Sequence, residues 1–272
     1  MKRWLLYALI GLFAITFCVS GYFLLTYRQE SVKNEQLYED LSQIVAEIRA
    51  TIPTAGTVAD DGPAEPTAGT DVPTEPTEPT ILPEYLPIYE LNQDLVGWIQ
   101  IEGTKINYPV LQSRDYKNYY IAHNFEGEAS KHGAIYAQET CDVFTPSDNV
   151  VLYGHRMNDG SMFADLLKYK DKSYYESHKY IRFDTLYERN TYEVIAVFQI
   201  KSVQNNTFQY HQFVDFEYES QFNTFMTRVD LLKLYNPGTT AYFGDQLLTL
   251  STCEKNYSNG RFVVIAKKID NG

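Results

Sequence analysis

The sequence predicts a fold of the α+β class, mainly β, in which strands close into a mixed barrel with helices inserted between them. Aromatic residues make up 15% of the 272 residues, with 23 Tyr and 15 Phe, and this composition suits pleated strands better than a helical bundle. Short apolar runs of strand character recur in the C-terminal part of the chain and are separated by polar turns. The sequence has no glycine-rich phosphate loop and no repeated βαβ pattern, which argues against a nucleotide-binding α/β fold.

Residues 1–27 are predicted to form a membrane-spanning signal-anchor. The 24 residues from Trp4 to Tyr27 carry no charge, which is enough for one helix to cross the roughly 30 Å hydrocarbon layer. Lys2 and Arg3 precede this run and acidic residues dominate the segment after it, so we expect a single-pass protein of the cell membrane with a cytoplasmic N-terminus. A cleavable signal peptide is the alternative, but its apolar run usually has only about 7–15 residues.

Two segments are expected between this span and the rest of the chain. Residues 28–50 are predicted to form a stalk helix, because Leu37, Leu41, Ile44 and Ile48 line one stripe, although the pattern is too short to predict a coiled coil. Residues 51–83 contain seven of the eleven prolines, six acidic residues and no Lys, Arg or aromatic residue. Such a segment cannot form a core, so we expect a disordered linker that acts as an extended spacer and holds a globular head away from the bilayer.

Residues 84–272 form the predicted head, whose 189 residues suit a single domain. Period-2 alternation and short apolar runs predict strands at 105–112, 133–137, 149–153, 191–200, 246–252 and 262–269. Helical spacing of apolar residues occurs at 162–169 and 218–229. This order of elements predicts a strand-rich domain with inserted helices.

Charge and cysteine content exclude several classes of function. The formal net charge is −12, from 23 basic and 35 acidic residues, which is the wrong sign for a nucleic-acid-binding protein. Cys18, Cys141 and Cys253 lie far apart, with no Cys-x-x-Cys pair and no His at metal-ligand spacing. We therefore expect no metal site, no disulfide framework and no cofactor.

Cys253 stands at the end of a predicted strand and close to a cation. A polar turn containing Asn259-Gly260 comes after it, and Arg261 then opens the next strand. A hairpin here would set Arg261 beside Cys253 across the ladder. A guanidinium favours the thiolate form of a neighbouring cysteine and can also hold a carbonyl oxygen or an oxyanion.

His155 is the best of the five histidines as a partner for this thiol. It comes after the apolar strand Val-Val-Leu-Tyr-Gly at 150–154 and precedes a polar loop, so it is a second titratable group at a strand end. A free cysteine is mostly protonated at neutral pH and normally needs a base or a cation nearby to act as a nucleophile. Cys253, His155 and Arg261 are thus the candidate catalytic residues.

These motifs closely resemble the signature of the sortases. The matching residues are His155 in Leu-Tyr-Gly-His, Cys253 in Thr-Leu-Ser-Thr-Cys, and Arg261 at the start of Arg-Phe-Val-Val-Ile-Ala. Asn-Tyr-Pro-Val-Leu at 107–111 and Asp-Gly-Ser-Met-Phe at 159–163 further resemble class B. The resemblance covers essentially all of residues 84–272 and implies a closed, eight-stranded sortase-type β-barrel as the catalytic domain.

The resemblance also implies a mechanism and partners. Cys253 would attack the carbonyl of a Thr in a C-terminal sorting signal and form a thioacyl enzyme. His155 would protonate the departing amine and then deprotonate an incoming peptidoglycan-precursor amine, while Arg261 would steady the oxyanion. The expected partners are surface proteins that bear a sorting signal, outside a Gram-positive cell.

The roles of two further residues and of one loop stay open at this point. Ser251 is either a residue that helps to bind substrate in the groove or an ordinary strand hydroxyl. Glu254 is either a participant in the site or a solvated turn residue. The segment 202–216 is a candidate groove-lining loop.

Two other functions compete with a transpeptidase. A cell-surface cysteine endopeptidase would use the same thiol with water as the acceptor, although in papain-like peptidases the nucleophile precedes His in the chain, whereas here His155 precedes Cys253. A non-enzymatic surface module would merely pack these residues. The sorting motif, the acceptor amine and the oligomeric state are not readable from the sequence.

Overall fold

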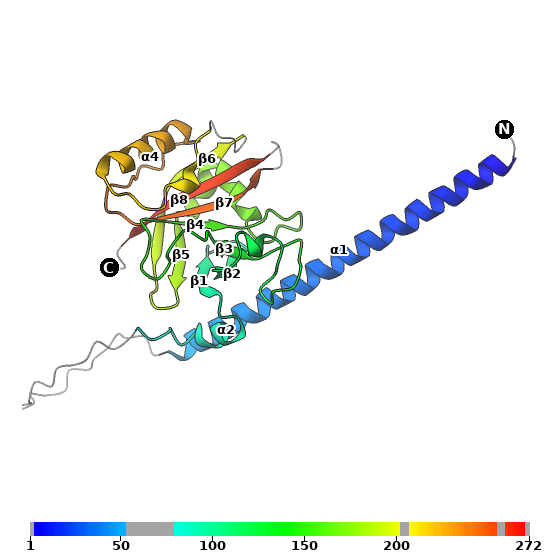
Figure 1. Cartoon of the computed structure of the whole chain (residues 1–272), viewed down its shortest axis with the longest axis horizontal. Coiled ribbons are helices and arrows are strands. Elements are labelled where there is room, and N and C mark those ends of the chain that lie inside the picture. Colours follow the sequence, from blue (N-terminus) through cyan, green and yellow to red (C-terminus); the bar gives the residue numbers. More distant parts are fainter. Residues whose placement is uncertain (1–2, 53–78, 202–206, 255–258, 270–272) are drawn as a thin grey trace, which may run out of the picture.

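The computed structural model describes residues 3–52, 79–201, 207–254 and 259–269. A long N-terminal helix, α1 (Arg3–Thr51), runs past a β-barrel, and the C-terminal half of α1 lies against the barrel (Figure 1). The segment 53–78, which holds most of the predicted disordered linker, lies outside the described residues.

Eight strands close the barrel in the order β1-β2-β3-β4-β7-β8-β6-β5, which confirms the expected eight-stranded fold. The pairs β2–β3 and β4–β7 are parallel, and the other six are antiparallel. The strands are β1 (Leu95–Gln100), β2 (Asn107–Leu111), β3 (Ile135–Ala137), β4 (Asn149–Tyr153), β5 (Tyr180–Thr185), β6 (Thr191–Ile200), β7 (Leu247–Glu254) and β8 (Gly260–Ile269). Around them lie α2 (Leu86–Leu91), α3 (Lys172–Ser177) and α4 (Glu219–Leu232), with the 3-10 turns η1 (Tyr119–Ile121), η2 (Ala164–Lys170) and η3 (Tyr210–Gln212).

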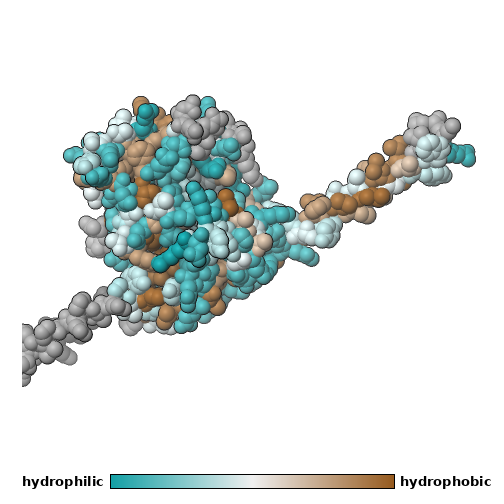
Figure 2. All heavy atoms as spheres, viewed as in Figure 1, coloured by the Kyte–Doolittle hydropathy of each residue, from teal (hydrophilic) through white to brown (hydrophobic). Residues whose placement is uncertain are grey.

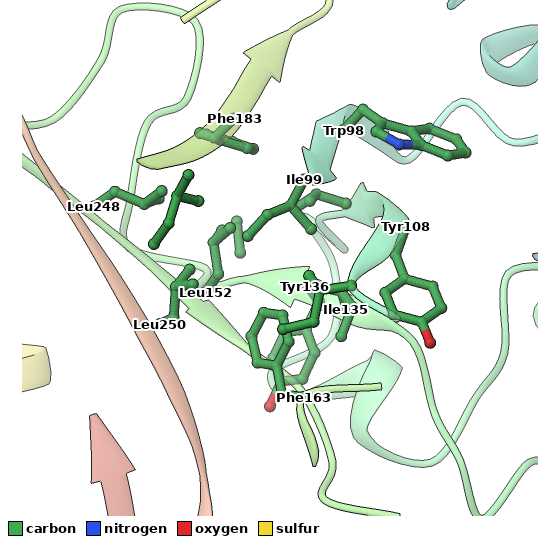
Figure 3. Packing of buried hydrophobic residues seen from close by; sticks show 14 of the residues in the cluster. Trp98, Ile99, Tyr108, Ile135, Tyr136, Leu152, Phe163, Phe183, Leu248 and Leu250 are labelled. Carbon is green, nitrogen blue, oxygen red and sulfur yellow. The ribbon is translucent and has the colours of Figure 1, made fainter. Parts of the chain in front are cut away.

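Apolar side chains fill the inside of the barrel. Ile99 of β1, Leu152 of β4 and Leu250 of β7 are fully buried and belong to one cluster (Figure 3). Alternate residues along a strand point to opposite faces, so the inward residues of β7 alternate with Thr249 and Ser251, which face outward. This alternation decides which face of β7 carries Cys253.

A second apolar cluster lies between α4 and the outer face of the sheet. The predicted stripe at 218–229 is confirmed, because Phe222, Phe225, Met226 and Val229 of α4 are all buried. They share this cluster with Val263, Ile265 and other outward residues of the neighbouring strands. Where they lie under α4, strands β6 and β8 are therefore covered on both faces, which explains the nearly continuous apolar runs of these two strands.

Two strands, β1 and β5, were not predicted from the sequence. All residues of β1 except Gln100 are buried, so the strand lacks the alternation by which the others were recognised. Its Gly97 is required by a close approach: a Cβ there would lie 2.2 Å from the Asp184 carbonyl oxygen on β5. The segment predicted as a helix at 162–169 forms the 3-10 turn η2 instead.

Helix α1 is continuous through the predicted membrane span and the predicted stalk helix. Residues 28–30 are Arg, Gln and Glu, all good helix formers, and no Pro or Gly separates the apolar run from the predicted stalk. The N-terminal part has an 18-residue window of mean hydropathy 2.2, none of it buried, and projects from the barrel (Figure 2). It is long and apolar enough to cross a membrane.

The face of α1 that packs on the barrel differs slightly from the predicted stripe: of the four predicted residues Leu41 is buried, and Leu37 and Ile44 are partly buried against the core. Tyr38, Leu41 and Val45 are buried in the same cluster as the barrel core, and the Tyr38 ring meets Tyr108 edge-on at 5.1 Å. Burial of these three side chains is worth on the order of 5 kcal/mol. Residues 30–49 thus belong structurally to the head and do not form a free stalk.

Both ends of the segment 53–78 lie at one face of the barrel. Arg49, near the end of α1, forms ion pairs with the fully buried carboxylates of Glu84 and Asp184. Just beyond the segment, the Leu82 amide donates to the Leu186 carbonyl at 2.7 Å. The described residues on both sides of this segment therefore contact the barrel, whereas the spacer predicted for 51–83 falls mostly on residues that the structure does not describe.

Candidate active site

Three adjacent strands place the predicted catalytic residues side by side. Cys253 is the penultimate residue of β7, and it pairs directly with Arg261 of β8 in the antiparallel ladder. Directly opposed residues point to the same face of a sheet. The hairpin expected from the sequence is therefore present, although residues 255–258 of its turn lie outside the described residues.

His155 reaches Cys253 from the other side of β7. Strand β4 runs parallel to β7, with Tyr153 opposite Ser251, and the Gly154 amide extends the pairing with a 3.2 Å bond to the Ser251 carbonyl. Two residues further along each strand, the same register brings His155 next to Cys253. The order β4-β7-β8 thus sets an imidazole, a thiol and a guanidinium in a row.

Gly154, the residue before His155, packs closely against side chains of the barrel core. A Cβ at this position would lie 2.4 Å from Ile135 Cδ1 and 2.7 Å from Phe163 Cδ2. A larger residue would push the strand end away from the barrel core and move His155 with it.

The half-buried His155 ring makes two polar contacts. Its pKa is raised chiefly by a side-chain hydrogen bond with Cys253, opposed by burial and aided by the Ile121 carbonyl. Nε2 lies 2.7 Å from the Ile121 carbonyl oxygen, which can only accept, so Nε2 carries a proton. In the neutral ring Nδ1 is then the acceptor, and this nitrogen is available to exchange a proton at the thiol.

These residues line an open groove with a volume of about 540 Å³. Arg261 is partly exposed and donates from Nη1 to the Gly260 carbonyl at 3.0 Å. The groove also contains the basic residues Arg114 and Lys117. With one acidic residue, Glu139, against these two and Arg261, the groove has the opposite sign of charge to the whole chain, whose net charge is −12.

The Tyr-rich wall of the groove was not predicted. Its aromatic members are Tyr136, Tyr153 and Tyr210. Tyr210 lies within the segment 202–216, which the sequence indicated only as a candidate loop without assigning a residue, and residues 202–206 of that loop are not described. Tyr136 and Tyr153 are strand residues, and a tyrosine in a strand gives no signal by which a groove could be recognised.

Ser251 also lines the groove, and its hydroxyl is bound to a neighbour. The Ser251 Oγ lies 2.6 Å from the Tyr210 hydroxyl, and both side chains are almost fully buried. Burial raises the pKa of Tyr210 to about 12. The hydroxyl of Ser251 thus fixes Tyr210 of η3, which forms part of the groove wall.

Glu254 is buried, which excludes the solvated turn residue that the sequence left open. Only 1% of its surface is exposed, and its carboxylate meets Lys170 Nζ at 2.7 Å and Gln199 Nε2 at 2.9 Å. Arg156, the residue after His155, lies 3.5 Å from the same carboxylate. The charges of Glu254 and Arg156 connect the strand end that carries Cys253 to the loop that carries His155.

The other two cysteines differ from Cys253 in their surroundings. Cys141 is buried, and burial raises its thiol pKa to about 11. Cys18 lies within the apolar part of α1. Among residues 3–52, 79–201, 207–254 and 259–269, no group of three or more His, Cys, Asp or Glu residues could hold a metal ion.

Comparison with known proteins gives a consistent result for sequence and fold. The family model of the sortase domain matches residues 99–269. The chain is 34% identical to sortase B of Listeria monocytogenes over 188 residues, which cover 68% of this chain and 74% of that protein. It is 32% identical to sortase B of Staphylococcus aureus over 191 residues, covering 70% and 76%.

Solved structures agree with this assignment. The sortase B–substrate complex of Staphylococcus aureus has a TM-score of 0.71 at 28% identity and covers 90% of this chain and 100% of that chain. Sortase B from B. anthracis has a TM-score of 0.69 at 29% identity, with coverage of 89% and 99%. The chain belongs to the sortase family, and within it to the class B cysteine transpeptidases.

Proposed function

We propose that Cys253 cleaves a C-terminal sorting signal after a Thr residue and passes the acyl group to an amine of a cell-wall precursor. The observation that carries this proposal is the position of Cys253, which lies between His155 and Arg261 in one open groove. A thiol placed between a proton-transfer group and a fixed cation is arranged for nucleophilic attack on a carbonyl. Burial of the Cys141 thiol makes it unsuited to this role.

The reaction runs in two halves that use the same three side chains. The Cys253 sulfur attacks the Thr carbonyl carbon, and the C–N bond to the next residue breaks as His155 gives a proton to the departing amine. The incoming amine then attacks the thioester and loses a proton to His155, and the sulfur leaves. The raised pKa of His155 favours the protonated ring that the first half requires.

Arg261 acts on the carbonyl oxygen. Its guanidinium offers a fixed fork of donors on the same face of the sheet as the sulfur, where negative charge develops on the tetrahedral intermediate. Ser251 contributes to substrate binding indirectly, by fixing Tyr210 in the groove wall. A groove of this volume takes an extended peptide of a few residues rather than a folded domain.

The proposed partners are surface proteins with sorting signals and a peptidoglycan-precursor amine. The Staphylococcus aureus sortase B structure is a complex with a substrate, which supports a substrate-binding role for the corresponding groove here. The apolar run of α1, preceded by Lys2 and Arg3, supports a single-pass anchor with the catalytic domain outside the cell.

A fragment of residues 28–272 tests this proposal, because the apolar window that it lacks makes no buried contact. We expect it to cleave peptides varied around Thr-Gly and Thr-Asn and to form an adduct on Cys253 that is visible in the intact mass. Cys253→Ala and His155→Ala should abolish cleavage, and Arg261→Lys should be severely impaired. Cys141→Ala is the matched control and should cleave normally.

Transfer is separated from hydrolysis by adding an amine acceptor. The transpeptidase predicts that acyl-amine products replace the acid products as the amine concentration rises. Only acid products at saturating amine would support a cysteine endopeptidase. Full activity of the His155 or Arg261 variant would disprove the role assigned to that residue.

A further inference from the structure

We propose that a cluster of basic residues in the groove, formed by Arg114, Lys117 and His211, is an anion subsite that selects sorting signals with an acidic residue near the scissile Thr. This inference rests on the proposed function and adds a substrate class to it. It is carried by the charge of the groove, by the hydrogen bonds that position its walls and by the position of the cluster beside Arg261.

The basic residues come from two walls of the groove. Arg114 and Lys117 belong to the segment between β2 and η1, whereas His211 belongs to η3. Cys253 and Arg261, from the ends of β7 and β8, line the same groove. The basic side chains of both walls therefore share one open space with the Cys253 sulfur.

Lys117 and Arg261 both act on the His211 ring. Burial is the main cause that lowers the pKa of His211, and the positive charges of Lys117 and Arg261 lower it further. Water and salt screen a charge beyond about 10 Å, so both cations lie close to the imidazole. Because Arg261 opposes Cys253 in the β7–β8 ladder, the basic cluster adjoins the thiol.

Hydrogen bonds fix both walls of this subsite to β3 and the segment after it. Gln138 Nε2 donates to the His211 carbonyl at 3.0 Å. On the other wall, the Tyr136 hydroxyl donates to Asn118 Oδ1 at 3.1 Å, next to Lys117. The backbone that carries the basic side chains is thus held in place before a ligand binds, which lowers the cost of binding.

The acidic residue of the groove does not balance these charges. Glu139 is the one acid among the groove residues, and its Oε1 accepts from the Asn118 amide. Within the described part of the chain, the exposed side chains of Arg114 and Lys117 form no ion pair. A carboxylate in the groove can therefore accept from both cations, and charge-assisted hydrogen bonds of this kind are about twice as strong as neutral ones.

A carboxylate is the anion that a peptide can offer to this cluster. Guanidinium and ammonium groups both bind carboxylates. His211 adds an N–H donor, because its lowered pKa keeps the ring mainly neutral at pH 7. Alternate side chains of an extended peptide point to opposite sides, so one side chain faces the cluster in a fixed register. The subsite therefore selects Asp or Glu at one position relative to the Thr.

The test measures cleavage by the full chain in detergent micelles. The peptides carry Gln or Glu at one position at a time, on both sides of the Thr. No amine acceptor is added, so that only the sorting peptide can supply the carboxylate. We expect kcat/KM to be about 10-fold higher for Glu than for Gln at one position and about equal at the others.

Variants at Lys117 test the assignment through this Glu-to-Gln ratio, in which the shared catalytic steps cancel. Lys117→Ala should reduce the ratio to about 3-fold, and the double variant with Arg114→Ala should bring it to about 1. Lys117→Glu should reverse the preference and favour Lys at the same position. Lys172→Ala removes the same charge from α3, outside the groove, and should keep the ratio of about 10.

Three results would overturn the subsite. The first is an unchanged ratio in Lys117→Glu. The second is a Glu preference of equal size at every position, because it would indicate only long-range attraction by a basic groove. The third is a preference that depends on Lys117 but concerns the acceptor alone, as in a comparison of glycine with glycinamide.

Binding to Cys253→Ala separates the subsite from the reaction. In fluorescence anisotropy, the labelled Glu peptide should bind about 10-fold more tightly than the Gln peptide, and adding Lys117→Glu should remove the difference. If the wild type cleaved neither peptide while this difference persisted, the proposed function would be disproved and the subsite supported. Cleavage of both peptides with equal binding would overturn the subsite alone.

Discussion

Replacing Arg49 with Ala should destabilise the head by about 3 kcal/mol, because it removes the cation that neutralises two buried carboxylates. Glu84 and Asp184 have fully buried side chains, and Arg49 also hydrogen bonds to the Tyr85 hydroxyl. Removing one partner of a buried ion pair typically costs about 3–5 kcal/mol, since a charge is left uncompensated.

The lower end of this range applies for two reasons. Glu84 retains Arg189 at 2.7 Å, and Asp184 retains the Tyr85 hydroxyl at 2.6 Å. The Arg49 side chain is also 22% exposed, so solvent already screens part of its charge. For a protein of this size, about 3 kcal/mol corresponds to a fall in Tm of roughly 6–12 °C.

The stability lost in the Arg49→Ala variant should depend on pH. Burial raises the pKa of Asp184, and the Tyr85 hydroxyl and Arg49 oppose this rise. Because Arg49→Ala removes one of the two opposing groups, the pKa of Asp184 in the folded variant should be higher still. A raised pKa means that the charged form destabilises the fold above that pKa, and the penalty disappears as the pH falls through it. The difference between wild type and variant should therefore be larger at pH 8 than at pH 5.

Thermal and urea unfolding of residues 28–272 measures this effect. Lys172→Ala is the control, because its pair with Glu176 is 3.8 Å long and more than half exposed on both sides. This control should cost less than about 0.5 kcal/mol. If Arg49→Ala were no more destabilising than Lys172→Ala, the C-terminal end of α1 would not be fixed to the barrel as described.

Three further predictions concern the active site. In Cys253→Ala the pKa of His155 should fall, because the hydrogen bond with Cys253 is the largest cause of its rise; an NMR titration of the ring measures this, and an unchanged or higher pKa would contradict the contact. At neutral pH, Cys253 should alkylate at least about 100-fold faster than Cys141, whose burial raises its pKa to about 11; equal slow labelling by mass spectrometry would count against a reactive Cys253. Glu254→Gln should lower the free energy of unfolding by about 3 kcal/mol, since Arg156 and Lys170 lose their counter-charge. A change below about 1 kcal/mol in urea unfolding would show that the pairing is weak.

The sequence was most informative where the residues of the site are close along the chain. Cys253 and Arg261 are eight positions apart on either side of a turn, so pairing of two local strands was enough to predict that they oppose one another, as the register shows. The α4 stripe was predictable for the same reason, because periodicity reports directly on which face is buried.

Other features depended on contacts between distant segments. The strand β1 lacks alternation because the closed barrel buries both of its faces. Glu254 looked like a turn residue, and only Lys170 and Gln199, from η2 and β6, show that it is buried and paired. Tyr210 carries no sequence signal for a groove wall, and its place is set by the hydroxyl of Ser251.

The sequence by itself determined the apolar run, the strand ends that carry His155 and Cys253, and the cation opposite the thiol, because each depends on composition or on neighbours in the chain. The tertiary structure alone decided the parallel register of β4 and β7, which brings His155 across 98 residues to Cys253, and the docking of α1 on the barrel. Pairing of distant strands and packing of a helix on a barrel depend on the shape of the assembled core, and no local pattern of residues specifies that shape.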